Sequence, residues 1–164
     1  GLDFFRMDAR RLLFQRARAN GLHAITCGPL GFGVAWLIFA PGGPSFDEFM
    51  AIKDGMDARE QLARFAVGLA PAGLHIPYID PSSVNLTDHR GPSSIIGVNL
   101  CAGVAAAEVL NLILKRRAPA CVPRYAQFDP YRRRSCLGTL RGGNRHPVQR
   151  VKLWYLKRLL TVRA

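Results

Sequence analysis

The sequence lacks paired cysteines, a long apolar run and any amino-terminal leader pattern. Its four cysteines are scattered with no Cys-x-x-Cys pair, which argues against a zinc site and a disulfide framework. The longest apolar run, 31–41, is shorter than the roughly 18 residues that a membrane span needs. Acidic and basic side chains interrupt the first ten residues, so we expect no signal peptide there. We therefore expect reduced thiols and a soluble, cytoplasmic protein.

Acidic residues are also nearly missing from the last third of the chain. Residues 115–164 hold fourteen of the 23 Lys and Arg residues but only one of the 11 acids, Asp129. Residues 1–114 are close to neutral, so the net charge of +12 belongs to the carboxyl-terminal third. The basic character therefore describes an extension and not the core of a domain.

The composition is that of one globular domain. Of the 164 residues 49% are hydrophobic and 21% are charged, which allows a core of ordinary size. The chain begins at Gly1 with a short apolar segment followed by an acid, a pattern typical of a strand-to-helix turn. We expect these residues to be cut from a longer polypeptide.

Hydrophobic periodicity and turn residues predict alternating helices and strands. Ser45 and Glu48 have the spacing of a capping box, and small residues of the long helix should pack closely against a sheet. The alternation favours an α/β or α+β fold. The predicted elements are helices over 4–20, 57–69 and 93–115, strands over 22–27, 33–40 and 124–129, and a loop over 70–92.

The last residues predict an amphipathic basic helix after a flexible Gly-Gly hinge. Its apolar stripe would be Val148, Val151, Tyr155, Leu159 and Val162. Such a helix can pack on the parent fold, bind an acidic protein partner, or bind anionic lipid or nucleic acid. Packing is the outcome we expect, because apolar positions outnumber basic ones between residues 148 and 160.

Three stretches taken in order resemble the second half of ThiF/HesA/MoeB domains, the ubiquitin-activating-enzyme-like adenylyltransferases. They are GLDFF…ARRLLFQRARANGLHAITCGPLGFGVAWLIFAPGGPSF, GPSSIIGVNLCAGVAAAEVLNLIL and RYAQFDPYR. The resemblance implies the carboxyl-terminal half of a doubly wound, Rossmann-like α/β domain with a mixed sheet over residues 1–134. Residues 135–164 would then be the basic helical extension.

The family adenylates a carboxylate with ATP, usually the terminal glycine of a ubiquitin-like or sulfur-carrier protein. By this resemblance Asp3 is the acid that positions Mg²⁺, and Arg10 is a weaker match to the family's helix arginine. From the residues alone, Asp3 is equally a cap of the following helix, and Arg10 a solvated or ion-paired side chain. We expect these 164 residues to turn over nothing by themselves, although the intact parent would be an enzyme.

Departures from the family pattern limit this interpretation. The glycine-rich loop that cradles phosphates lies upstream in the family, and GPLGFG at residues 28–33 predicts only a turn. Where relatives carry the first cysteine pair of a zinc site, residues 45–48 read Ser-Phe-Asp-Glu, so we expect no zinc. The loop 70–92 holds no cysteine for a thioester. Cys101 is read as a small buried hydrophobe, and Cys27 is the one thiol worth testing.

Other interpretations stay open. One loop brings together His75, Asp80, Asp88 and His89, which could act as a metal or acid–base cluster or simply form turns. No Gly-x-Ser-x-Gly elbow supports a serine hydrolase. The alternative to an enzyme fragment is a non-catalytic α+β interaction module whose basic arm binds an acidic partner, anionic lipid or nucleic acid. A homodimer is compatible with either.

Overall fold

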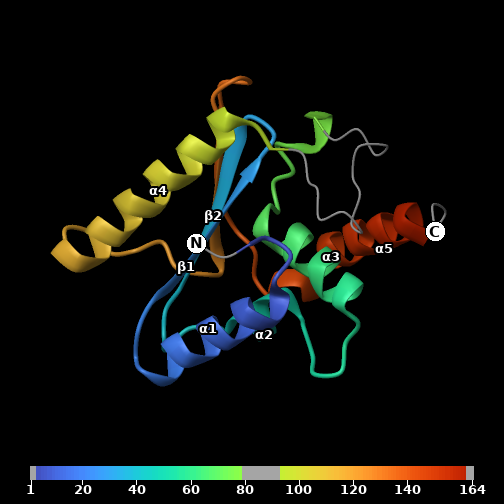
Figure 1. Ribbon diagram of the computed structural model, residues 1–164, viewed down its shortest axis with the longest axis horizontal. Helices are drawn as coiled ribbons and strands as arrows, with labels where there is room; N and C mark the ends of the chain where they lie inside the picture. Colours follow the sequence, from blue (N-terminus) through green and yellow to red (C-terminus); the bar gives the residue numbers. More distant parts are fainter. Residues whose placement is uncertain (1–2, 79–92, 162–164) are drawn as a thin grey trace.

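The computed structural model describes residues 3–78 and 93–161, with side chains up to Arg158 (Figure 1). Helices and one antiparallel sheet form a single folded unit. The elements are α1 (Met7–Ala19), β1 (Ala24–Leu30), β2 (Gly33–Phe39), α2 (Phe46–Met50), α3 (Ala58–Leu69), the 3-10 turn η1 (Ile76–Tyr78), α4 (Ile95–Leu114), β3 (Arg124–Asp129), β4 (Arg134–Thr139), the 3-10 turn η2 (Gly143–Arg145) and α5 (Pro147–Thr161).

The sheet is a four-stranded meander in the order β1-β2-β3-β4, and every neighbouring pair is antiparallel. The expected mixed sheet of a Rossmann-like α/β half-domain is therefore wrong, and the fold is α+β. Short turns join β1 to β2 and β3 to β4, and a connection of that length can only produce antiparallel neighbours. The long excursion through α2, α3 and α4 also returns to β2 in the antiparallel sense.

Helices cover both faces of the sheet at β1 and β2. One face of β2 points its alternate residues Ala35, Leu37 and Phe39 into the main core beside α1, α2 and α3. The other face lies under α4, which packs on β1 and β2 from the opposite side (Figure 1). Because both faces are covered, β2 is buried along nearly its whole length, as its continuous apolar sequence predicts.

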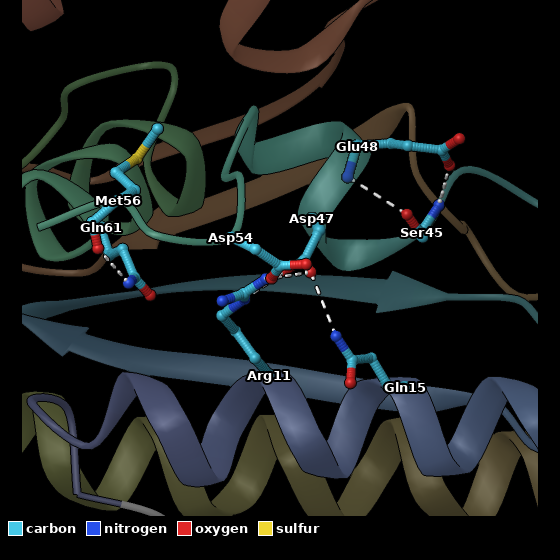
Figure 2. Close-up of polar contacts among 8 residues, drawn as sticks. All are labelled: Arg11, Gln15, Ser45, Asp47, Glu48, Asp54, Met56 and Gln61. Carbon is cyan, nitrogen blue, oxygen red and sulfur yellow. Dashed lines mark hydrogen bonds and ion pairs between the residues drawn. The ribbon is translucent and has the colours of Figure 1, made fainter. Parts of the chain in front are cut away.

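Local capping signals place the helix starts near the expected residues. Ser45 and Glu48 form the expected capping box at α2, with Glu48 N–H donating to Ser45 Oγ and Ser45 N–H to the Glu48 carboxylate (Figure 2). At α4, Ser94 Oγ accepts from Gly97 N–H. These bonds satisfy helix donors that have no partner inside the helix, which is why both helices begin there.

Residues 28–33, expected to be a turn, mostly extend the two strands. β1 runs on through Gly28 to Leu30, only Gly31 and Phe32 make the turn, and Gly33 starts β2. Gly31 has φ +62°, in the left-handed region that favours glycine. At Gly33 a Cβ would lie 2.5 Å from the Phe128 carbonyl oxygen, so strand β3 can approach only because this residue has no side chain.

Helix α5 packs on α3, but through a different face from the expected stripe. Gln149 and Leu153 are buried, whereas Val148, Val151 and Tyr155 are more than half exposed. The Gln149 amide donates to the Val67 carbonyl on α3 and to Asn144 Oδ1. The tail therefore does dock on the domain, as expected, while three members of the predicted stripe, Val148, Val151 and Tyr155, face solvent. The other two, Leu159 and Val162, lie outside the residues whose side chains are described.

Candidate functional site

Asp3 lies in the segment that leads into α1, with its side chain exposed. Its Oδ1 accepts a hydrogen bond from Phe5 N–H at 3.0 Å, and its carbonyl accepts from Arg6 N–H at 3.3 Å. The carboxylate thus closes a tight Asx turn before the helix, whose N-cap is Arg6. Asp3 is engaged locally through one oxygen and remains open to solvent, but it does not cap α1, because no side chain caps the first turn of that helix.

Arg10 is not available to contact a phosphate in this structure. Its side chain is buried, with the residue only 6% exposed, and its guanidinium lies 4.4 Å from the centre of the Phe65 ring. Nη1 donates to Thr26 Oγ1 at 3.2 Å, and Nη2 donates to the Asp3 carbonyl at 2.9 Å. Burial lowers the pKa of Arg10, and the charge of Asp3 partly offsets that effect. In this structure the Arg10 side chain joins α1 to β1 and to the Asp3 segment.

Arg10 and two phenylalanines instead hold the Asp3 segment against the core. Phe4 packs on Phe65 with ring centres 5.0 Å apart, and Phe4 contacts Phe5 edge to face at 5.5 Å. Together with the bond from Arg10 to the Asp3 carbonyl, these contacts fix the main chain from Asp3 to Phe5. Asp3 is therefore an exposed acid on an anchored segment.

A single carboxylate is compatible with Mg²⁺ but does not make a protein cage for it. Magnesium in phosphoryl-transfer sites commonly binds one or two carboxylates, several waters and the substrate phosphates. Within residues 3–78 and 93–161 no group of three or more His, Cys, Asp or Glu side chains is arranged to hold a metal ion. Asp3 thus fits the role of one ligand, provided that the phosphates are held by other groups.

Residues 45–48, which stand where ThiF-type proteins carry a first cysteine pair, have a structural role here. Figure 2 shows Arg11 between Asp47 and Asp54, with Arg11 Nη2 2.8 Å from Asp47 Oδ2 and 2.6 Å from Asp54 Oδ1. The hydrogen bonds of Arg11 to Asp47 and, to a smaller extent, to Asp54 raise the pKa of its guanidinium. With Ser45 and Glu48 in the capping box, this stretch ties α1 to α2 and offers no thiol to zinc.

Cys27 lies within β1, under α4, and not at the end of a strand beside a cleft. It is half-buried and hydrogen-bonds to Cys101 on α4. That bond and burial raise the pKa of Cys27, which keeps the thiol protonated and lowers its nucleophilicity. Cys101 faces the sheet, in keeping with its interpretation as a packing residue.

The suggested loop cluster is described only at His75. Asp80, Asp88 and His89 lie outside the described residues. Burial, and then the charge of Lys152, lowers the pKa of His75 to about 4, so the imidazole is neutral at physiological pH. Next to it, burial and the Asp129 carboxylate raise the pKa of Tyr78 to about 12.

The carboxyl-terminal helix borders a cationic hollow that the sequence did not reveal as a site. The hollow has a volume of about 400 Å³ between α3, η2 and α5. Two of the residues that line the hollow, Arg64 and Lys157, pair with Glu60 at 2.7 Å and 2.8 Å. These ion pairs neutralise part of the positive charge of the hollow. Its lining includes Ala51, Arg64, Asn144, Arg145, Arg150, Leu153, Trp154 and Lys157.

Helix α4 exposes an apolar surface that sequence analysis expected to be buried. Of the small residues expected to face the sheet, Gly97 does so, whereas Ala102, Gly103, Ala106 and Ala107 are exposed. By length and composition α4 could cross a membrane, with mean hydropathy 1.7 and 17% of the window buried. In this fold it lies along β1 and β2 instead.

Comparisons with protein-family models, curated proteins and solved structures find no match to the chain.

Proposed function

We propose that the chain is the part of an ATP-dependent adenylyltransferase that carries the magnesium-positioning acid Asp3. The substrate would be a carboxylate, at the carboxyl terminus of a ubiquitin-like or sulfur-carrier protein. One observation carries the proposal: Asp3 is an exposed acid on an anchored segment, at the start of the stretches that resemble ThiF-type domains. They form α1, the β1–β2 hairpin, α4 and β3.

The chemistry explains why an acid is needed at this position. A carboxylate attacks the α-phosphate of ATP and pyrophosphate leaves, so two anions must approach each other. Magnesium, when bound, neutralises part of that charge. Asp3 Oδ1 accepts from Phe5 N–H and fixes the carboxylate orientation, while its exposed side faces solvent. Arg10 is a positioning residue that holds the Asp3 carbonyl.

The phosphate-binding groups are not supplied by the described residues in this proposal. The glycine-containing stretch 28–33 is a strand, a turn and a strand, and no helix follows it to present amide groups to phosphates. Arg10 is buried in the core. We therefore expect another segment or chain to cradle ATP, and the 164 residues alone to show no turnover.

Pyrophosphate exchange into ATP tests the proposal. The full-length polypeptide that contains these residues should exchange labelled pyrophosphate in the presence of Mg²⁺ and a protein ending in a free glycine carboxylate. Removal of that terminal glycine should abolish the exchange, and the 164-residue chain should show none. A full-length polypeptide that does not exchange with any carboxylate-terminated carrier would rule out the proposal.

A second candidate, an interaction module with a basic arm, is favoured by the cationic hollow beside α5. Arg145 and Arg150 are exposed at its rim, next to the half-exposed ring of Trp154. An anionic segment seated there would meet two guanidinium groups and an aromatic face. The α+β architecture is compatible with this function, which needs no nucleotide.

Salt dependence distinguishes this candidate from the enzyme fragment. If the hollow binds anions, affinity for an acidic peptide should fall steeply with salt. Arg150→Glu should weaken binding by about tenfold or more, whereas Arg59→Glu on the exposed start of α3 should change it little. Equal effects of the two substitutions would show that the hollow is not a specific site. Tighter binding to RNA or DNA than to the peptide would assign it to nucleic acid.

A further inference from the structure

Two of the four cysteines face each other across the layer between β1 and α4. Residues of β1 alternate between the two faces of the sheet, so Cys27 and Pro29 lie on the face under α4, whereas Thr26 points toward α1. On α4, Gly97 and Cys101 are one helical turn apart and therefore share one side of the helix. The contact of Gly97 with β1 shows that this side faces the sheet.

The backbones of α4 and β1 are as close at Gly97 as a disulfide requires. A Cβ at Gly97 would lie 3.5 Å from the Pro29 Cβ. Cysteines that form disulfides have their Cβ atoms roughly 3.5–4.5 Å apart. Ser94 N–H and Ser94 Oγ both donate to the Gly31 carbonyl, so α4 begins at the end of β1 and packs back along it.

One step further along both elements, the facing residues are the two cysteines. Two residues back along β1 cover about 6.7 Å, and four residues onward along α4 cover about 6 Å. Cys101 therefore lies over Cys27 much as Gly97 lies over Pro29. The two thiols are in hydrogen-bond contact, and Cys27 is the donor. The fold thus brings together two sulfur atoms that are far apart in the sequence.

The two thiols differ in reactivity. The hydrogen bond from Cys27 lowers the pKa of Cys101, although burial opposes that change. The same bond, together with burial, raises the pKa of Cys27. Because the thiolate is the nucleophile, Cys101 should react first. Both residues are half-buried, which leaves access for a small oxidant.

We propose that Cys27 and Cys101 are a peroxide-sensitive thiol pair, which a hydroperoxide converts into a disulfide between β1 and α4. The Cys101 thiolate attacks the peroxide O–O bond and becomes a sulfenic acid, and the other oxygen leaves as hydroxide and is protonated to water. The Cys27 sulfur then attacks the sulfenic sulfur, and the sulfenic hydroxyl leaves with the Cys27 proton as a second water. The two sulfurs lose two electrons, and the peroxide gains them. Neither step needs ATP or Asp3, so the proposal goes beyond adenylation.

The disulfide would fasten α4 to the sheet. In the reduced protein, the side of α4 that faces the sheet carries buried polar atoms without partners, Glu108 Oε2 and Asn111 Nδ2. Such atoms weaken the attachment of a helix. A covalent bond between distant residues also restricts the unfolded chain, so oxidation should raise the Tm by about 5–10 °C.

Peptide mapping after peroxide treatment tests which thiols pair. Trypsin separates the four cysteines into the peptides 19–53, 91–115, 118–124 and 135–141. We expect hydrogen peroxide to link 19–53, which contains Cys27, to 91–115, which contains Cys101, within one chain. Dithiothreitol should reverse the link. A link from 91–115 to either of the other two peptides overturns the proposal, as does the absence of any link.

Alanine variants separate pairing from simple exposure, because all four cysteines are half-buried. Cys27→Ala and Cys101→Ala should each lose the rise in Tm that peroxide produces. The matched controls Cys121→Ala and Cys136→Ala should keep it. A rise that survives in Cys27→Ala overturns the proposal.

Alkylation of the reduced wild-type chain tests the order of reaction and needs no variant. Limiting iodoacetamide should label Cys101 several times faster than Cys27, because the hydrogen bond favours the Cys101 thiolate. Equal or faster labelling of Cys27 overturns the assigned roles.

Discussion

Replacement of Arg10 by methionine tests whether this buried guanidinium organises the Asp3 segment. The substitution keeps a long unbranched side chain in the core and removes the charge, the bond to Thr26 Oγ1 and the bond to the Asp3 carbonyl. It also removes the contact between the guanidinium and the Phe65 ring. The test therefore separates polar organisation from simple filling of space.

The expected loss of stability follows from these contacts. Thr26 is 2% exposed, so its hydroxyl loses a donor that water cannot readily replace, at a cost of roughly 1–3 kcal/mol. The lost cation–π contact adds about 0.5–2 kcal/mol. Relief of the buried charge, whose Nε has no hydrogen-bond partner, offsets part of this. We expect a net loss of about 2 kcal/mol, or about 4–8 °C in Tm.

Urea unfolding and amide hydrogen exchange provide the assay. Arg10→Met should lower the unfolding free energy and speed exchange at Phe5 N–H, which is held by Asp3 Oδ1. Arg16→Met, on the exposed side of the same helix, is the matched control and should change stability by less than about 0.5 kcal/mol. If Arg10→Met matched that control and left exchange at Phe5 unchanged, Arg10 would not position Asp3.

Three further changes test other parts of the structure. His75 has a folded pKa of about 4 against an ordinary value of 6.5, so the unfolded chain binds the proton more readily. Stability should fall as pH drops from about 6.5 to 4, by on the order of 3 kcal/mol, and His75→Leu should remove that part of the slope in urea titrations. Gly33→Ala should destabilise the fold by about 1–3 kcal/mol, because the added Cβ would meet the Phe128 carbonyl oxygen, whereas the control Gly42→Ala should leave the melting temperature unchanged. Equal melting temperatures of the two variants would contradict the close approach of β3 to Gly33. Asn144→Ala should cost about 2–4 kcal/mol and loosen α5, because Asn144 Nδ2 donates to the Met50 and Arg64 carbonyls; unchanged Trp154 fluorescence and stability would contradict it.

Signals that act over a few residues were enough to locate most helices. The capping box at Ser45 and Glu48 involves only contacts within one turn, and Ser94 caps α4 in the same way. The continuous apolar run of β2 likewise predicts a strand covered on both faces. None of these features needs knowledge of the rest of the chain, which is why they can be read from the sequence.

The direction and number of the strands depend on partners distant in sequence. Nothing local in β3 tells whether it joins β2 parallel or antiparallel, and the family resemblance led us to expect a mixed sheet. The sequence pattern does not predict strand β4, because β4 is a largely solvated edge strand. Its alternation between exposed and half-buried residues is too weak to indicate a strand. Its residues Arg134 and Ser135 are both exposed.

Polar residues in buried positions account for the remaining errors at the candidate sites. Helical periodicity ranks Val151 and Tyr155 as docking residues of α5, yet Gln149 is buried because its amide reaches the Val67 carbonyl on α3. Arg10 is buried for a similar reason, because its guanidinium donates hydrogen bonds to Thr26 Oγ1 and to the Asp3 carbonyl. Apolar patterns carry no information about such pairings, which appear only when the elements are assembled.

The charge of Asp3 is the central requirement of the proposed function, and pyrophosphate exchange by the full-length polypeptide measures it most directly. Asp3→Asn keeps an oxygen that can accept from Phe5 N–H, so the turn should survive while the negative charge is lost. Asp8→Asn, at an exposed acid in the first turn of α1, is the matched control. We expect Asp3→Asn to reduce exchange by on the order of 100-fold or more, with the control unchanged. Equal exchange by Asp3→Asn and wild type would show that Asp3 only closes the turn before α1.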